Sequence, residues 1–259
     1  MSIVLVEDHG PVRHVILNRP EKRNAMNDEL IAALGGALHD AAHDAAVRIV
    51  IVRGAGAMFS SGVDIGALAN LSAHPHRLRE FRTAILQAWN LCEEMTKPTI
   101  AQIHGGCLGG AMELALACDL RVMASEAMIG LVETRVGLIP DVGGSSRLPA
   151  VVGLGRAKEM IMASKIISGV EAERIGLVNR VAPAEALTDA TQGLVDELLA
   201  CAPVAIGLAK RVLDAAAKPA LASTLELEVL SQQVCARSAD FAEGTLALAQ
   251  KRQPEFAGG

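Results

Sequence analysis

Two glutamates lie in apolar segments of the sequence, at a spacing that suits acid–base chemistry. Glu113 follows the glycine-rich run HGGCLGG, and Glu133 comes 20 residues later, after the apolar run IGLV. A carboxyl group among apolar side chains loses contact with water, and its pKa rises toward the range needed for proton transfer. The local sequence equally allows Glu113 to lie on a solvated helix face and Glu133 to pair with Arg135.

The small-residue segments near these glutamates contain backbone N–H groups that a ligand oxygen can approach. Gly110 lies at the expected start of a helix, whose free N–H groups and positive dipole end attract anions. The turn MFSSGVD at 58–64 follows an apolar strand and is also built from small residues. Such a turn leaves amides open to a polarised carbonyl, although most turns of this kind bind nothing.

A third acidic residue, Asp141, follows Pro140 in a loop that contains several glycines. An acid in an otherwise apolar loop is a candidate for proton transfer, because its surroundings change its pKa. The same position suits a residue that only forms a turn. Asp141 therefore stays a candidate at this point.

Composition excludes several kinds of partner. The formal net charge is −5, so the chain presents no basic field for nucleic acid or an anionic membrane. The five cysteines are far apart and mostly lie in apolar runs, which indicates free thiols in a reducing compartment. The first residues turn acidic early, and no stretch reaches the length of a membrane span. We expect a cytoplasmic protein with no nucleic-acid or membrane partner and no metal site.

The elements that must position these residues alternate between strands and helices. A hairpin is expected at 4–7 and 12–18, a helix that opens at Asn27, and a strand at 48–53. A polar loop then leads to a helix at 75–95 and to strands at 99–103 and 120–123. Ser168 and Glu171 form a capping box for a further helix. The remainder reads as helices, roughly at 187–200, 203–217, 220–237 and 239–251.

Together these segments resemble the crotonase family of enoyl-CoA hydratases and isomerases. The shared motifs are F-S-S-G-x-D at 59–64, G-x-x-x-G-G-x-x-E at 105–113, Glu133 beyond it, and G-L-x-P-x-x-G-G-x-x-R-L at 137–148. Four motifs in the family's order and spacing are specific. The resemblance implies an α/β fold, a crotonase-like spiral of repeated ββα units with a C-terminal α-helical region. The core that binds acyl-CoA would be 1–185, and 186–259 would form homotrimers or homohexamers.

The resemblance also implies the chemistry. The backbone N–H groups of Ser61 and Gly110 would hold the thioester oxygen and stabilise the enolate. Glu113 would help to activate a water molecule, and Glu133 would give a proton to Cα. The substrate would be a 2-enoyl-CoA thioester, and no metal or redox cofactor would be needed because the thioester accepts the electrons.

Coenzyme A would be bound by the loop at 22–26, the turn at 60–65 and a C-terminal lysine. Lys251 matches the family's lysine that reaches the nucleotide phosphate, often of a neighbouring subunit, although it equally suits a solvated helix end. The residues that the resemblance assigns to CoA binding are Lys22, Asn24, Ala25, Met26, Ser60, Gly62, Asp64, Ile65 and Lys251.

Two positions depart from the hydratase pattern. Ala111 replaces a third glycine, which a helix tolerates well. Asp141 stands where many hydratases have glycine and where dienoyl-CoA isomerases have a proton-shuttling acid. The alternatives are therefore a dienoyl- or enoyl-CoA isomerase that uses Glu133 with Asp141, or an acyl-CoA-binding paralogue without turnover. Hydration is favoured because both glutamates are present.

Overall fold

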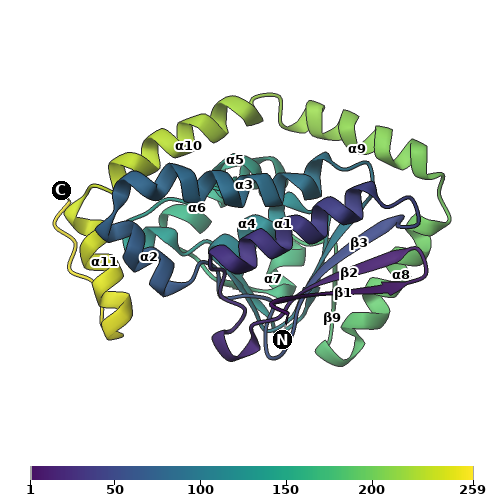
Figure 1. The fold of residues 1–259 in the computed structure, drawn as a ribbon, viewed down its shortest axis with the longest axis horizontal. Helices are drawn as coiled ribbons and strands as arrows, with labels where there is room; N and C mark the ends of the chain where they lie inside the picture. The colour runs from purple at the N-terminus through teal and green to yellow at the C-terminus, as the bar shows by residue number, and fades with distance from the viewer. Residues whose placement is uncertain (1, 259) are drawn as a thin grey trace.

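The computed structural model describes residues 2–258, with a main sheet in the order β1-β2-β3-β4-β6-β9 (Figure 1). The expected hairpin is confirmed: β1 and β2 are antiparallel, and each later neighbour in this sheet is parallel. The strands are β1 (Val4–His9), β2 (Val12–Leu17), β3 (Ile49–Gly54), β4 (Thr99–Ile103), β6 (Leu120–Ala124) and β9 (Arg180–Ala182).

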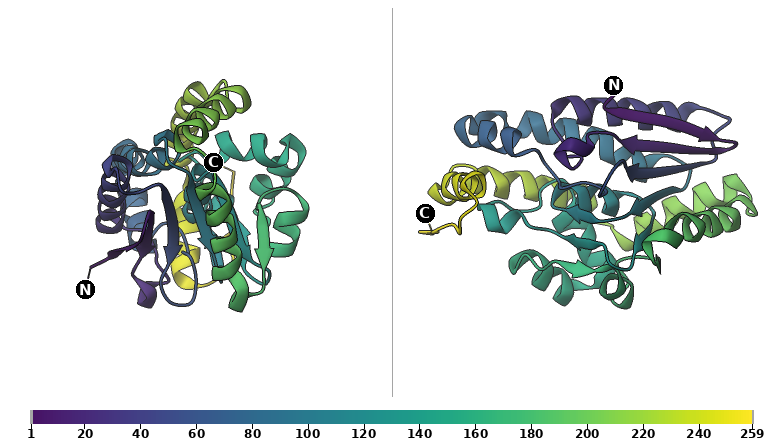
Figure 2. Two further views of the ribbon diagram at one scale, coloured as in Figure 1. Left: turned by 90° about the vertical axis from the view of Figure 1, so that its right-hand side faces the viewer. Right: turned by 90° about the horizontal axis from the view of Figure 1, so that it is seen from below.

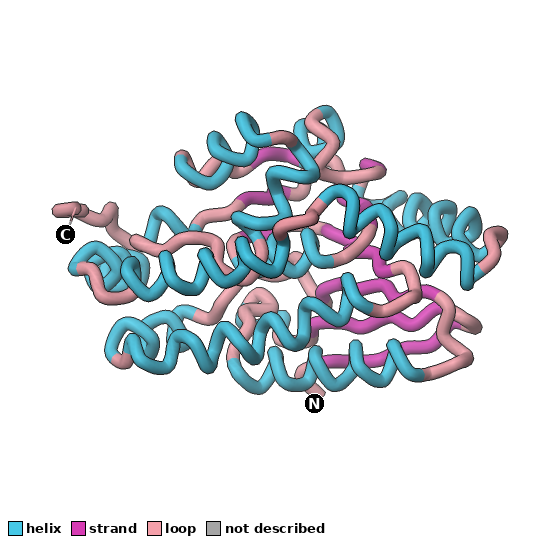
Figure 3. The backbone as a smooth tube through the Cα atoms, turned by 90° about the horizontal axis from the view of Figure 1, so that it is seen from above, coloured by secondary structure: helices cyan, strands magenta, loops and turns pink. Residues whose placement is uncertain are grey.

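The central strands are mostly buried because helices cover the sheet. Every residue of β4 is buried, which is typical of parallel strands that have no solvated face. Helices α1 (Asp28–His43) and α3 (Leu78–Glu94) share one core with these strands. Trp89 of α3 is fully buried in this core. The helices run along the strands when the molecule is viewed from above (Figure 3).

A second, smaller sheet lies beside the first and has the order β5-β7-β8. Its strands are β5 (Gly106–Leu108), β7 (Met128–Gly130) and β8 (Ile167–Ser168). The chain passes from the large sheet to the small sheet and then to a helix in β4–β5–α4 and again in β6–β7–α5. This repeat confirms the expected spiral of ββα units.

Helices form most of the rest of the chain. Figure 1 shows α9 and α10 forming an arch over one side of the molecule, with α11 at one end. The expected C-terminal helices are confirmed as α8 (Leu187–Leu199), α9 (Pro203–Ala217), α10 (Leu221–Cys235) and α11 (Ala239–Gln250). The Ser168 hydroxyl accepts from the Glu171 amide and caps α7 (Gly169–Arg174), as the capping box predicts. Two further views show α8 beside the main sheet (Figure 2).

The structure differs from the sequence prediction after the turn at 58–64. Helix α2 (Ile65–Ala73) occupies the expected polar loop, because the Asp64 carboxylate accepts from the Gly66 amide and caps it. Leu71 then packs with Leu138 and Phe241, contacts that local sequence does not contain. Helices α4 (Gly110–Ala117), α5 (Gly144–Val152) and α6 (Leu154–Met162) complete the core. Within residues 2–258, no helix is both long and apolar enough to cross a bilayer.

Candidate active site

A cavity of about 740 Å³ opens between the glycine-rich segments and helices α2 and α3. Its apolar wall suits an acyl chain, and acidic side chains meet at one part of its surface. Both glutamates and Asp141 line it. The apolar wall includes Leu68, Leu71, Leu78, Phe81, Ile85, Val136 and Leu138.

Glu113 lies in the first turn of α4, where every residue is buried. Its Oε1 atom accepts hydrogen bonds from the backbone amides of Val142 at 2.9 Å and Gly144 at 2.8 Å. Burial raises the pKa of Glu113 well above its usual value, and the nearby Glu133 and Asp141 carboxyls raise it further. The amide of Gly144 acts in the opposite direction because it stabilises the ionised form.

Glu133 begins the short 3-10 helix η3 (Glu133–Val136) and has different surroundings. Neither carboxyl oxygen has a hydrogen-bond partner among the described residues. Burial raises its pKa to about 8, and the charge of Asp141 adds to this effect. The raised pKa favours the protonated form of Glu133. Hydrogen bonding distinguishes the two glutamates, because only Glu113 accepts from backbone amides, which stabilise an ionised carboxylate.

Gly109 lets the Glu133 carboxyl approach the start of α4. Its backbone has φ 56° and ψ −131°, a conformation that side chains disfavour. A Cβ atom at Gly109 would lie 3.2 Å from Oε1 of Glu133. The glycine therefore leaves room for the acid beside the start of α4.

Asp141, in the loop after Leu138, lines the same cavity as the two glutamates. Burial raises its pKa to about 7, although the Arg82 guanidinium lowers it. Its Oδ2 atom lies 3.7 Å from Nε of Arg82 and has no hydrogen-bond partner. Three carboxyls thus line one cavity, and the charge of Asp141 raises the pKa of both glutamates.

The amides of Val63 and Gly110 are the free backbone donors beside these acids. Neither has an acceptor among residues 2–258, and both residues line the cavity. The bridge between Met26 and Val63 uses the amides of Met26 and Asp64, which leaves the Val63 amide on the opposite side. A Cβ atom at Gly110 would lie 3.2 Å from Cγ2 of Val63, so the two residues are adjacent.

This geometry corrects the expectation that the Ser61 amide holds the thioester oxygen. Its amide donates to the carbonyl oxygen of Arg23 at 3.0 Å and is not available to a ligand. Val63, two residues later, takes its place. The motif locates the turn, but the direction of each amide depends on pairing with the loop at 22–26.

The loop at 22–26 reaches the cavity through Lys22, Arg23 and Ala25. Asn24 does not line the cavity, contrary to the expectation of direct contact with CoA. Its side chain is fully buried, accepts from the amide of Arg19, and donates to the carbonyl groups of Ala55, Met58 and Phe59. Asn24 therefore holds the loop in place.

Met26 and Ser60 are fully buried and also lie outside the cavity lining. The Ser60 hydroxyl donates to the carbonyl of Asn24 and accepts from the amide of Gly62. These residues support the two segments that the resemblance assigned to CoA. Gly62, Asp64 and Ile65 line the cavity as expected.

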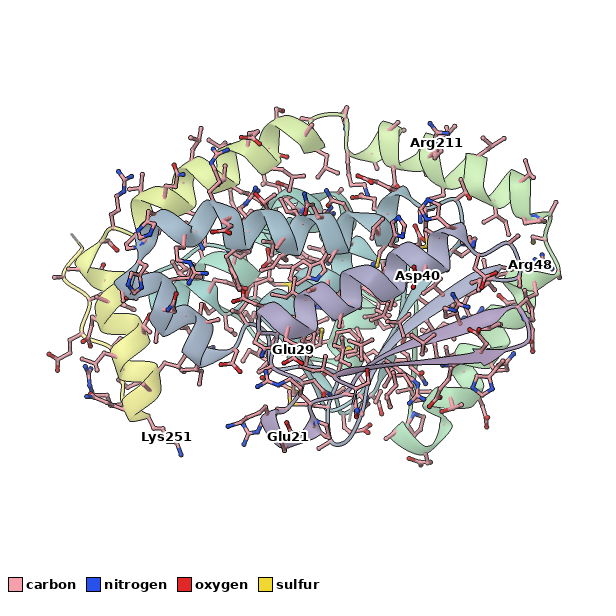
Figure 4. All side chains as sticks on the ribbon, viewed as in Figure 1. Glu21, Glu29, Asp40, Arg48, Arg211 and Lys251 are labelled. Carbon is pink, nitrogen blue, oxygen red and sulfur yellow. The ribbon has the colours of Figure 1, made fainter. Side chains whose placement is uncertain are left out.

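Lys251 ends α11 and does not line the cavity of its own chain. Figure 4 shows it projecting from the tip of the helix, away from the body of the molecule and on the same side as Glu21. Its role in CoA binding stays a prediction.

Sequence reasoning missed several polar residues at the site. Arg82 of α3 and Gln232 of α10 line the cavity, and Glu228 of α10 bonds the loop beside it. Arg82 lies on the apolar stripe of its helix, with Leu78 and Ile85 one turn on either side. A charge on such a stripe is a signal that the sequence contains.

Comparisons with known proteins agree with this geometry. A family model described as enoyl-CoA hydratase/isomerase matches residues 7–259. The crotonyl-CoA hydratase of Syntrophomonas wolfei is 33% identical over 98% of this chain and 97% of its own. The methylglutaconyl-CoA hydratase of Mus musculus is 35% identical over 99% and 86%. A carnitinyl-CoA hydratase structure from Mycobacterium avium aligns with a TM-score of 0.88 at 30% identity, covering 100% of both chains.

Proposed function

Because this chain belongs to the enoyl-CoA hydratase/isomerase family, we propose that its cavity adds water across the 2,3 double bond of 2-enoyl-CoA thioesters. The observation that carries this is the pair of glutamates that line the cavity, Glu113 buried and Glu133 with both carboxyl oxygens buried, in unlike surroundings. Glu113 has two amide donors on one oxygen, and Glu133 has none. One of the pair is thereby suited to activate water and the other to donate a proton.

The reaction uses the two glutamates in sequence. Glu113 accepts a proton from the water molecule while the water oxygen attacks Cβ of the substrate. Glu133 transfers its own proton to Cα. The negative charge that develops on the thioester oxygen lies against the amides of Val63 and Gly110, and losing one such donor typically costs about 2.7–4 kcal/mol. No metal or redox cofactor enters these steps, because the thioester carbonyl accepts the electron pair.

Coenzyme A would lie across the loop at 22–26 and the turn at 60–65. Lys22 is exposed on this rim, and Arg19 pairs with Asp64 at 3.0 Å below it. Lys251 would reach the nucleotide of a neighbouring subunit, since it projects away from its own chain. This assignment follows the family pattern and the position of the side chain.

Assembly and location complete the proposal. Helices α9 and α10 expose Val212, Leu213, Leu230 and Val234, all more than half exposed, and such a surface suits contact with further copies. A homotrimer, or a hexamer of two trimers, fits the expected role of 186–259. Gln232 and Leu248 from that region also line the cavity. All five cysteines are free thiols, which supports the cytoplasm.

The test is hydration of a short 2-enoyl-CoA in water enriched with ¹⁸O. The expected result is a 3-hydroxyacyl-CoA that carries the label at C3, with loss of the conjugated thioester absorbance. A panel of linear, branched and aromatic enoyl-CoAs then defines the acyl group. If no member of the panel gains solvent oxygen, the chain is not a hydratase.

Isomerisation is the second candidate, because Asp141 adds a third buried carboxyl near Glu133. An isomerase would move a proton between carbons without adding water. It would ignore 2-enoyl-CoA, convert a 3,5-dienoyl-CoA, and lose that activity with Asp141→Asn. A hydratase keeps most of its activity toward 2-enoyl-CoA in that variant.

A further inference from the structure

Glu228 is a buried carboxylate on α10 that takes no part in the reaction described above. Its side chain is 4% exposed, although it lies on a helix whose other face is open to solvent. It accepts hydrogen bonds from the amide of Gly143 at 3.0 Å and from the amide and hydroxyl of Ser146 at 2.8 and 2.6 Å. A buried carboxylate with three hydrogen-bond donors does not serve solubility, and it holds the groups that donate to it.

The loop between β7 and α5 is held between two carboxylates by alternate amides. The amides of Val142 and Gly144 donate to Glu113, and the amide of Gly143 between them donates to Glu228. Successive amides therefore point in opposite directions along the loop. Moving the Glu228 side of the loop must move the donors that hold Glu113.

The positive charge of Arg82 closes this arrangement. Its guanidinium lies 3.5 Å from Oε2 of Glu228 and donates to the carbonyl groups of Asp141 and Leu225, each at 2.5 Å. Arg82 therefore joins α3 to the loop and to α10. It also compensates the Glu228 charge, so that the carboxylate can stay ionised inside the protein.

Gln232, one helical turn after Glu228, anchors the beginning of the same loop. Its Oε1 atom accepts from the amide of Ile139 at 3.0 Å. The inner face of α10 thus fixes the loop at both ends of the segment that carries Asp141. The C-terminal region is part of the scaffold of the site.

We propose that Glu228 is a positioning residue for Glu113. Glu228 fixes the loop at 139–146, so that the Val142 and Gly144 amides hold the Glu113 carboxylate in its reactive orientation. The inference rests on the proposed hydration. Glu228 touches neither substrate nor the reacting atoms. Its charge also raises the pKa of Glu113, so the role of the loop is tested on the loop amides as well as on kcat.

The principal variant is Glu228→Gln, which keeps the shape of the side chain. A glutamine cannot accept from both Gly143 and Ser146 with the same two atoms, because one of its atoms is a donor. The expected kcat for hydration falls roughly 10- to 100-fold. The expected KM stays within about threefold, because the CoA contacts lie on other segments.

The matched control is Glu226→Gln, the same chemical change on the same helix. The Glu226 side chain is 67% exposed and lies 4.0 Å from Arg79 at the surface. Its kcat and KM should equal those of the unmodified protein. Glu228→Asp, which retains the charge and shortens the side chain, should recover part of the lost kcat.

Amide hydrogen exchange separates this inference from the proposed function. In Glu228→Gln, exchange should become faster at Val142 and Gly144, which bond Glu113 and do not touch Glu228. Faster exchange at these two amides supports the positioning role even if the unmodified protein hydrates no enoyl-CoA. Absence of hydration would contradict only the proposed hydratase function. Unchanged exchange at both amides, or unchanged kcat in an active enzyme, would overturn the inference. If Glu228→Gln does not fold, the same readings are taken on Glu228→Asp.

Discussion

The backbone nitrogen of Gly144 lies 2.8 Å from Oε1 of Glu113, and there is no room between the two residues for a methyl group. A Cβ atom at position 144 would lie 2.8 Å from that oxygen and 2.7 Å from Cβ of Pro140. Gly144→Ala should therefore displace the Glu113 carboxylate. We expect kcat for hydration to fall roughly 10- to 100-fold, measured with a short 2-enoyl-CoA.

Gly155→Ala is the control for this change, because a Cβ atom at Gly155 meets nothing within 4 Å. It lies in α6 and has a helical backbone, so alanine should keep or slightly raise stability. Its kcat should not change. Equal losses in both variants would show that the effect at Gly144 is not specific to Glu113.

The acid–base pair gives the most direct prediction. Glu113→Gln and Glu133→Gln should each lower kcat for hydration by about 10²–10⁴-fold, because each removes one proton transfer. Affinity for a non-reactive CoA thioester, measured by calorimetry, should stay within a few-fold. Retained turnover in either variant would contradict the mechanism.

The pKa of Glu133 predicts the alkaline side of the pH profile. Burial raises this pKa to about 8, and the carboxyl must be protonated to donate. We expect kcat/KM to fall as the pH rises through about 8. The charge of Asp141 raises the pKa of Glu133, so Asp141→Asn should shift this decline to lower pH and lower hydration modestly. A decline that does not move would show that Asp141 is electrostatically separate from Glu133.

The raised pKa of Glu133 also lowers the stability of the folded protein at alkaline pH. Glu133 binds its proton more tightly in the folded state, so its own contribution to stability is greatest at low pH and falls as the pH rises from about 4.5 toward 8. Glu133→Gln removes this loss. Its melting temperature should exceed that of the unmodified protein at pH 8.5, by a smaller margin at pH 5.5. Glu126→Gln, a change at an exposed position, should give equal melting temperatures at both pH values.

The exposed leucines of the arch predict assembly. Leu213 is 68% exposed on α9 and Leu230 is 54% exposed on α10. Light scattering at micromolar concentration should give the mass of a trimer or hexamer. Leu213→Asp or Leu230→Asp should lower that mass if copies meet on these helices. A monomeric unmodified protein would contradict the assembly proposal.

The sequence was sufficient for the parts of the site that depend on local pattern. The strands and the C-terminal helices follow from apolar periodicity, and the motifs located both glutamates and Gly110. Prediction from the sequence failed where contacts between distant segments determine the local structure. The sequence predicts a polar loop where helix α2 lies, because the stability of this short helix comes from packing against Leu138 and Phe241.

The other features that the sequence did not predict depend on the direction in which an amide or a side chain points. Ser61 and Val63 lie in one turn, and only the pairing with the loop at 22–26 shows which amide is free. Glu228 has no sequence signal, because α10 has apolar residues on its exposed face as well as its buried face. A residue whose partners lie more than 80 positions away cannot be assigned from its neighbours.

Asn24 has a consequence for the chemical ageing of the protein. Its amide nitrogen serves three carbonyl groups, so spontaneous deamidation to aspartate would place a negative oxygen against them and release the loop beside the cavity. Deamidation begins when the next backbone nitrogen attacks the side-chain carbonyl. That nitrogen, in Ala25, is bonded to the carbonyl of Lys22 at 3.0 Å, and Asn24 itself is buried away from water. The contacts that shape the loop therefore also protect it from the reaction that would damage it during long storage.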